Sequence, residues 1–398
     1  MTENKPVTLH AKLSASGSDK WMTCTPSMRM EEGFADEQSD FSREGTFAHE
    51  VFENMVKRYL KQITAKEYVA RREELQENSF WSDSLVDYVT AAYDKAVERI
   101  DYANSVCLDP ALMVEQRLDF SPWVPQGFGT GDLVIVTNDY VEVLDLKYGK
   151  GIYVDGENNS QMRLYALGAY NQFGMIYEVK TVRTLVLQPR LNNYSGEEMP
   201  IEDLIDWAYN KVKPAADLAW NGEGELVAGA HCTQSFCRAR FTCPKRAEES
   251  LAVAQSEFAL VEPELLTLAQ IAEILPKADL AINWLTDVKE YALKQAVKGI
   301  EVPGHKLVEG RSTRRYGSMD DVANRLRDED IDDALVYERS LLGITAMEKA
   351  LGGRKRFDRL LGDLIVKPAG KPTLVPSSDK RSAITLSTSV DEDFSEPV

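Results

Sequence analysis

The sequence predicts an α/β protein: a central mixed sheet flanked by helices, with a mainly helical C-terminal extension. Along the first part of the chain, strand-like stretches alternate with helical ones, which is typical of a mixed α/β core. Further along, the strand-like stretches stop and long helical patterns replace them. We therefore expect a core over residues 1–250, a mainly helical module over 251–385 and an acidic disordered tail over 386–398.

The core is expected to begin with helices. Residues 42–61 carry apolar side chains along one helical face, and a second helical stretch covers about residues 82–105. The elements expected after them, in chain order, are strands at 112–120, 131–136 and 140–147, a helix at 159–174, a strand at 180–189 and a helix at about 201–220.

The extension is expected to begin with two helices. Residues 266–299 keep helical periodicity, but Pro276 lies inside the pattern and predicts a break there. Gly299 predicts the end of the second helix, because glycine is the usual residue just past a helix C-terminus.

The composition of the chain indicates the class of protein to which it belongs. The chain has 398 residues, of which 43% are hydrophobic and 28% charged, as in soluble globular proteins. No apolar run approaches the ~20 residues that span a bilayer, and the N-terminus lacks the pattern of a signal peptide. We expect an intracellular protein that does not enter a membrane. The net charge of −18 argues against a generic basic nucleic-acid coat, but an enzyme can confine its positive charge to one groove.

A predicted hairpin places two aspartates face to face. The Asn-Asp pair at 138–139 is suited to a tight two-residue turn between the second and third strands. If Thr137 pairs with Tyr140, Asp132 lies directly opposite Asp145. Directly opposed side chains have Cβ atoms ~4.5–5.5 Å apart. The two carboxylates can therefore hold one divalent cation.

The same hairpin supplies a lysine. Lys147 shares the face of Asp145 because side chains alternate along a strand, whereas Glu142 lies on the other face. Mg²⁺ or Mn²⁺ held by carboxylates polarises a phosphate and lowers the pKa of a bound water. An ammonium group can orient that water or stabilise developing charge. The pattern favours metal-assisted phosphodiester hydrolysis, and the alternative is a surface hairpin with a solvated Asp–Lys pair.

Two further segments carry polar side chains that are unremarkable alone. His49 lies on the first long helix and by itself is more often an ordinary helical residue than a ligand. Gln161 and Tyr165 lie one turn apart on one helical face, and by themselves are a packing face with a polar neighbour. These segments become informative when their order along the chain is considered together with the hairpin that lies between them.

In this order the segments resemble the RecB-like branch of the PD-(D/E)XK nuclease superfamily. Its motifs G-x-x-x-H, G-x-x-D, D/E-x-K and Q-x-x-x-Y correspond to residues 45–49, 129–132, 145–147 and 161–165. The resemblance covers about residues 10–250 and implies a restriction-endonuclease-like core. The metal ligands that it implies are His49, Asp132, Asp145 and the backbone carbonyl of Leu146. The other site residues that it implies are the catalytic Lys147, together with Gln161 and Tyr165, which contact DNA or order the site.

Other segments resemble a phage and prophage family of RecB-like proteins. They are KWMTC near the start, the cysteine-rich HCTQSFCRARFTCPKRA, and the late GHKLVEGRSTRRY and GKPTLVPSSDKR. This resemblance implies a protein of the bacterial host cytoplasm, encoded by a phage or prophage. Because such nucleases often accompany phage single-strand annealing proteins, a protein of that kind is a candidate partner beside DNA.

Four of the five cysteines form a separate pattern. Cys232, Cys237 and Cys243 lie close together and Cys24 lies far upstream, whereas Cys107 stands apart and is expected to be structural. Reduced intracellular cysteines favour free thiols or metal ligands over disulfides. The pattern resembles the iron–sulfur staple of AddB-type and CRISPR-adaptation nucleases, which implies a [4Fe–4S] cluster, although the spacing is longer than C-x-x-C. The alternatives are a structural Zn²⁺, with His231 as a spare ligand, and ordinary buried cysteines.

The extension carries clustered cations but no nuclease motif. Arginine binds phosphate bidentately, and nearby glycines let the backbone approach it closely. We expect these cations to guide DNA toward the metal site, or to do so with a neighbouring subunit of a homo-oligomer. Acidic residues between 320 and 333 leave a solvated surface as the alternative. The expected DNA-binding residues are Lys306, Arg311, Arg314 and Arg315.

Together these features predict a divalent-metal-dependent DNA exonuclease that acts in phage DNA recombination or processing. One alternative is a DNA-end-binding or assembly protein that keeps the fold without cleaving. Another is a structure-specific endonuclease. The presence of Asp132, Asp145 and Lys147 favours an enzyme, because degenerate nuclease folds commonly lose such residues.

Overall fold

The computed structural model describes residues 11–34, 40–258, 268–308, 325, 347, 351, 354–361 and 364–365. The chain divides into two compact units, Met1–Val302 and Pro303–Val398. The first unit holds the whole sheet and the helices that flank it. In the second unit the described part includes the helix α15 (Arg354–Leu361), whereas the tail over 386–398 lies outside the described residues.

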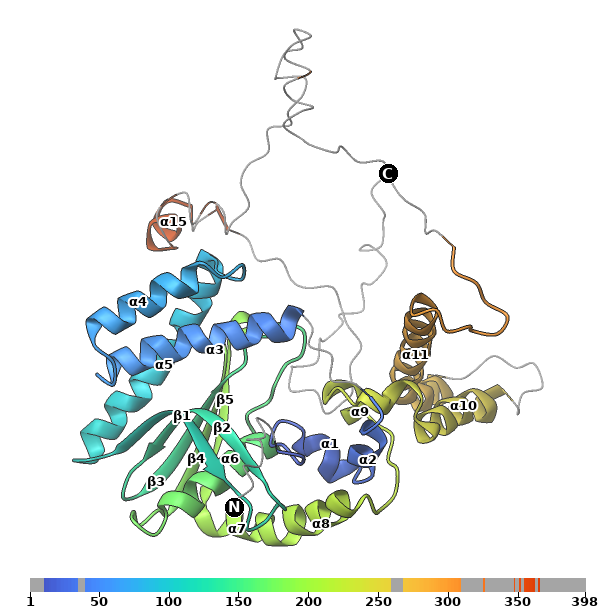
Figure 1. The fold of residues 1–398 in the computed structure, drawn as a ribbon, viewed down its shortest axis with the longest axis horizontal. Helices are drawn as coiled ribbons and strands as arrows, with labels where there is room; N and C mark the ends of the chain where they lie inside the picture. The colour runs from blue at the N-terminus through green and yellow to red at the C-terminus, as the bar shows by residue number, and fades with distance from the viewer. Residues whose placement is uncertain are drawn as a thin grey trace, which may run out of the picture. The chain divides into compact units, whose positions relative to one another are not determined.

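A five-stranded mixed sheet forms the centre of the first unit (Figure 1), in agreement with the predicted α/β class. Its strands lie in chain order, β1 (Ala111–Asp119), β2 (Phe128–Val136), β3 (Tyr140–Leu146), β4 (Thr181–Gln188) and β5 (Asn193–Pro200). Strands β3 and β4 are parallel, and the other neighbours are antiparallel. The helix α6 (Ser160–Phe173) connects the parallel pair, as a crossover requires.

The β2–β3 hairpin has the register that its turn predicts. Leu133 pairs with Leu144, and the Thr137 amide donates to the Tyr140 carbonyl at 2.9 Å. The pairing of β2 with β3 ends at Leu133 and Leu144, so Asp132 and Asp145 are the next residues outward on their strands.

Helices cover both faces of the sheet (Figure 1), which explains why its central strands are almost continuously hydrophobic. On one face, α3 (Asp40–Tyr59) and α5 (Asp83–Val106) pack against odd-numbered residues of β2 such as Leu133. Both helices agree with the helices predicted over 42–61 and 82–105. Glu142 also lies on this face, where Arg99 of α5 donates to it at 2.7 Å, as the predicted alternation requires.

The opposite face of the sheet packs against α6 and a second group of helices. Even-numbered residues of β2 such as Val134 belong to this core. Its helices are α1 (Ser18–Thr23), α7 (Ile201–Trp207) and α8 (Lys213–Asn221), and a π-helical turn, Ala208–Val212, links the last two. This continuous stretch occupies the helix predicted over about 201–220.

The helix α4 (Ala65–Gln76) and the strand β5 are among the elements that were not predicted. The helix begins at a capping box in which Thr64 and Glu67 bond each other's backbone amides, a signal present in the sequence. The edge strand β5 has a mostly polar sequence with no clear alternation. Its Gly196 lies so close to β4 that a Cβ there would meet the Thr184 carbonyl oxygen at 1.8 Å.

The predicted break at Pro276 is wrong. A single helix, α11 (Leu268–Val297), runs through it, because an interior proline removes one backbone hydrogen bond but leaves the turns on either side intact. The predicted end is confirmed: Gly299 has a φ of 84° and donates to the Ala296 carbonyl.

The first compact unit continues well past residue 250 because α11 is bonded to α10 (Pro244–Phe258) and to the turn before it. Asp287 of α11 accepts from the buried Arg246 at 2.6 Å and from Arg240 at 3.3 Å. The short helices α2 (Ser27–Glu31) and α9 (His231–Gln234) complete this end of the unit. Among the described residues, no helix is long and apolar enough to span a bilayer.

Candidate functional site

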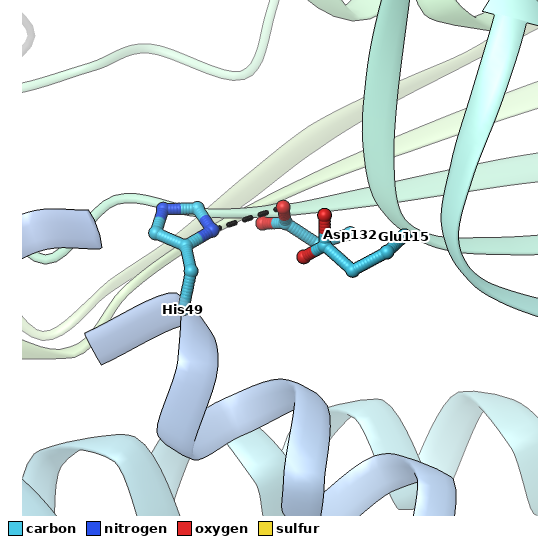
Figure 2. A group of neighbouring side chains, drawn as sticks. All are labelled: His49, Glu115 and Asp132. Atoms are coloured by element: carbon cyan, nitrogen blue, oxygen red, sulfur yellow. Dashed lines mark hydrogen bonds and ion pairs between the residues drawn. The ribbon is translucent and has the colours of Figure 1, made fainter. Parts of the chain in front are cut away.

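Asp132 is the central residue of a polar cluster at the end of the β2–β3 ladder. It is 5% exposed, and its two carboxylate oxygens have different partners. One oxygen lies 2.9 Å from Nδ1 of His49, which reaches over from α3 (Figure 2). The other accepts from the backbone amide of Leu146 at 2.6 Å. One carboxylate therefore joins β2, β3 and α3.

The carboxylate of Asp132 favours the charged form of the His49 imidazole. Burial lowers the pKa of His49, but the carboxylate of Asp132 more than offsets it and raises the pKa to about 9. A ring that donates to Asp132 cannot bind a cation through the same nitrogen. Metal binding at this site therefore requires His49 to lose a proton.

Glu115 of β1 is the third member of the cluster, and the sequence reasoning missed it. Its neighbours pair with β2, Val114 with Leu133 and Gln116 with Gly131, so Glu115 lies across from Asp132. Its φ of 52° lies in the left-handed region, an uncommon conformation for a non-glycine residue and one that often marks functional sites.

His49, Glu115 and Asp132 bring one ligand atom each within 4.8 Å of one another (Figure 2). Burial and the adjacent Asp132 carboxylate raise the pKa of Glu115 to about 7. Burial and a neighbouring negative charge both favour the protonated form of a carboxyl group, and a bound cation would act in the opposite direction. The predicted ligands His49 and Asp132 therefore do meet, and the third group within this distance is Glu115.

Asp145 lies beside this group, within a second chain of contacts. Lys147 has its Nζ 2.8 Å from Oδ2 of Asp145 and donates to Oε1 of Gln161 at 3.0 Å. The amide nitrogen of Gln161 donates to Oδ1 of Asp145 at 3.3 Å and to the Tyr165 hydroxyl at 3.1 Å. The predicted residues of β3 and α6 thus lie in one hydrogen-bonded group.

The carboxylate of Asp145 is incompletely satisfied. It is 3% exposed, and burial raises its pKa although Lys147 opposes this. The ammonium of Lys147 lies within ion-pair distance of Oδ2, yet no described residue donates a well-directed hydrogen bond to this oxygen.

These donors fit a hard divalent cation. The set consists of carboxylates with one imidazole, which Mg²⁺ and especially Mn²⁺ accept. His49, Glu115 and Asp132 would hold the ion, with the carboxylate of Asp145 beside them. Leu146 contributes its backbone amide to Asp132, a contact that the prediction of its carbonyl as a ligand did not include.

Two motif glycines have different surroundings. A Cβ at Gly129 would meet Cε1 of Tyr165 at 2.4 Å, so only glycine lets this ring pack against β2. At Gly45, inside α3, nothing lies within 4 Å of such an atom. The first glycine has a steric reason in this fold, and the second has none that the contacts show.

Alanine at these two glycines should have opposite effects on the free energy of unfolding. Gly129→Ala forces the Tyr165 ring out of place and should destabilise the protein by about 1–3 kcal/mol, as overpacking does. Gly45→Ala should be neutral or stabilise it by up to ~1 kcal/mol, because glycine is unfavourable inside a helix. Denaturant unfolding of both variants tests this, and equal effects would contradict the Tyr165 contact.

The four predicted cysteines meet around one small cavity of about 20 Å³. All four are buried and none forms a disulfide. Cys24 follows α1, and the other three belong to the segment that begins with α9. Cys24, near the start of the chain, therefore lies close to three cysteines that are more than 200 residues further along.

In the described residues no three of these four sulfurs lie mutually within 4.8 Å, and His231 Nε2 lies 3.6 Å from Cys232 Sγ. Burial raises the pKa of Cys237 to about 12, so ligation must supply the energy to deprotonate it. His231, the spare ligand for zinc, has Nε2 3.1 Å from the Val227 carbonyl oxygen.

One of the four predicted DNA-binding cations lies within the described residues. Lys306 is exposed in the second unit. Arg311, Arg314 and Arg315 lie outside the described residues, so their role stays a prediction.

A comparison with protein families found one match that covers most of the chain. The model of a family described as a protein of unknown function, DUF2800, matches residues 10–382. This range includes the polar cluster on β1, β2, β3, α3 and α6, the four cysteines and the described part of the second unit. Because the match covers most of its length, the chain belongs to the DUF2800 family.

Proposed function

We propose that this protein is a divalent-metal-dependent DNA nuclease of the RecB-like PD-(D/E)XK type. One observation carries the proposal: four segments with nuclease-like motifs, distant in sequence, converge on one site. His49, Asp132, Asp145 and Lys147, with Gln161 and Tyr165, are linked by contacts of 2.6–3.3 Å. Chance would seldom bring all the predicted polar side chains together.

The protein's own residues divide into two groups by their chemistry. The carboxylates and His49 would hold an ion, which polarises the scissile phosphate and acidifies a bound water. Lys147 is positioned by Gln161 and Asp145 and presents its ammonium where negative charge develops on the phosphate. Glu115 adds a carboxylate to the ligand set that the sequence motifs imply.

The choice among nuclease types needs an experiment on DNA. Linear end-labelled DNA and covalently closed circles are incubated with Mn²⁺, Mg²⁺ or a chelator. An exonuclease degrades only the linear DNA and only with metal. A structure-specific endonuclease opens circles, and an end-binding protein shifts linear DNA on a gel without cutting it. Absence of metal-dependent cleavage on any DNA would overturn the proposal.

Lys147→Ala should lower the cleavage rate by about 10²–10³-fold, the cost typical of removing one group that stabilises developing charge. His49→Ala should be milder and should act through metal affinity, so that excess Mn²⁺ restores much of the rate. Rates measured across Mn²⁺ concentrations separate the two effects. Rescue of Lys147→Ala by excess metal would contradict the role assigned to the ammonium.

We also propose a [4Fe–4S] cluster on Cys24, Cys232, Cys237 and Cys243. The observation that supports it is that four buried thiols, none in a disulfide, line one cavity. The cluster would act as a staple, because one ligand comes from the start of the first unit and three come from its segment 232–243. The family resemblance further supports a role in phage DNA recombination, with a single-strand annealing protein as a candidate partner.

A further inference from the structure

The segment 149–153 presents apolar side chains to solvent beside the proposed active site. It begins two residues after Lys147. Tyr153 is 59% exposed and Ile152 is 36% exposed. Lys150, between Gly149 and Gly151, is exposed, and no described residue pairs with its ammonium. Single exposed apolar residues are common, but here an aromatic and an aliphatic side chain adjoin a free cation.

Buried amides hold this segment in place. Gln188 of β4 is 1% exposed, and its side-chain nitrogen donates to the carbonyls of Gly149 at 3.0 Å and Ile152 at 2.7 Å. Its oxygen accepts from the amide of Val154 at 3.1 Å. Asn193 of β5 donates both to this oxygen at 3.1 Å and to the Val154 carbonyl at 2.7 Å.

This arrangement fixes the shape of the segment while leaving its tip in water. Two buried side-chain amides direct their hydrogen bonds at both ends of 149–153, so the exposed tip is anchored to the sheet. Anchoring of this kind pre-organises a surface for a ligand, since less conformational entropy is lost on binding. Covering this exposed apolar area with a ligand removes it from water, which is favourable.

We infer that segment 149–153 is a platform for unpaired nucleic acid, on which Tyr153 stacks against a base while Lys150 contacts the phosphate chain. This inference rests on the proposed function and adds its substrate form. Aromatic rings and backbone-tracking cations are the combination that binds single strands without regard to sequence. A base inside a duplex has no free face, so the strand that reaches the site must be unpaired.

The position of the platform fits this role. Lys150 is three residues from Lys147, so the backbone separates the two by at most ~11 Å. One single strand can therefore contact both, with the phosphate to be cleaved at Lys147 and its neighbours at Lys150 and Tyr153.

The test measures binding of a short thymidine oligonucleotide in a chelator, so that no cleavage occurs. Tyr153→Ala should weaken binding about tenfold, whereas Tyr153→Phe should bind like the parent, because the ring is retained. Met175→Ala is the matched control: Met175 is 99% exposed, just past the far end of α6 from Gln161, and should change nothing. Blunt duplex should bind more weakly than the single strand.

An abasic strand separates stacking from other contacts. The parent should bind it about tenfold more weakly than the thymidine strand, and Tyr153→Ala should bind both strands alike. Equal binding by the parent and Tyr153→Ala, or an equal loss on both strands, would overturn the inference. If the parent cleaves DNA but binds independently of Tyr153, only the platform fails. If it binds through Tyr153 but never cleaves, the nuclease proposal fails and the platform stands.

Discussion

Asp132→Asn should reduce metal-dependent DNA cleavage by about a thousandfold or more, because several kcal/mol of charge stabilisation depend on this carboxylate. Asp132 contacts His49 and the Leu146 amide and lies within the cluster that includes Glu115. Asparagine keeps the size of the side chain but removes the charge. The change should therefore remove the ion while leaving the strands paired.

The same hairpin supplies a matched control. Glu142 is also a buried carboxylate on β3, but it lies on the opposite face and pairs with Arg99 of α5. Glu142→Gln should lower stability while the folded protein keeps its specific activity. Cleavage rates and Mn²⁺ binding are measured for both variants, after circular dichroism has shown that each is folded. If Asp132→Asn cleaved DNA as fast as the parent, the assignment of the site would be wrong.

Asp145→Ala should also abolish cleavage, with a different effect on its neighbours. Lys147 and Gln161 both lose a partner when this carboxylate is removed. Burial raises the pKa of Asp145 and so opposes its ionised form, whereas Lys147 favours that form. We expect a folded but inactive protein. A folded variant that still cleaves DNA would show that Asp145 is not required for catalysis.

Cys24→Ala should remove the proposed cluster and destabilise the first compact unit. Cys24 is the only one of the four cysteines from the start of the chain, so its loss would remove the link that the cluster adds between α1 and the segment around α9. Ligand binding contributes directly to folding free energy, and losing it should lower the melting temperature by many degrees. The parent, purified without oxygen, should be brown and contain about four iron atoms per chain.

Cys107→Ala is the control for this experiment. Cys107 caps α5, is only partly buried and does not line the cavity of the other four. It should keep the iron and the colour. A colourless anaerobic parent with one zinc atom would establish the zinc alternative, and a metal-free parent would leave four ordinary buried thiols.

The sequence by itself determined the local geometry of the candidate site. The turn at 138–139 and the alternation of β2 and β3 fixed which side chains share a face, because both depend on residues close in the chain. Helical spacing likewise placed Gln161 and Tyr165 on one side of α6. The prediction of a break at Pro276 was wrong because the cost of one lost hydrogen bond is small beside that of interrupting a long helix.

The tertiary structure alone decided which distant residues joined them. Nothing local marks Glu115, since its position depends on how β1 pairs with β2 and on a left-handed backbone at one residue. The anchoring of segment 149–153 by Gln188 and Asn193 likewise joins parts of the chain that no short-range pattern relates. Spacing and periodicity describe neighbours in sequence, whereas strand pairing and buried hydrogen bonds arise only when the sheet closes and desolvated polar groups must find partners.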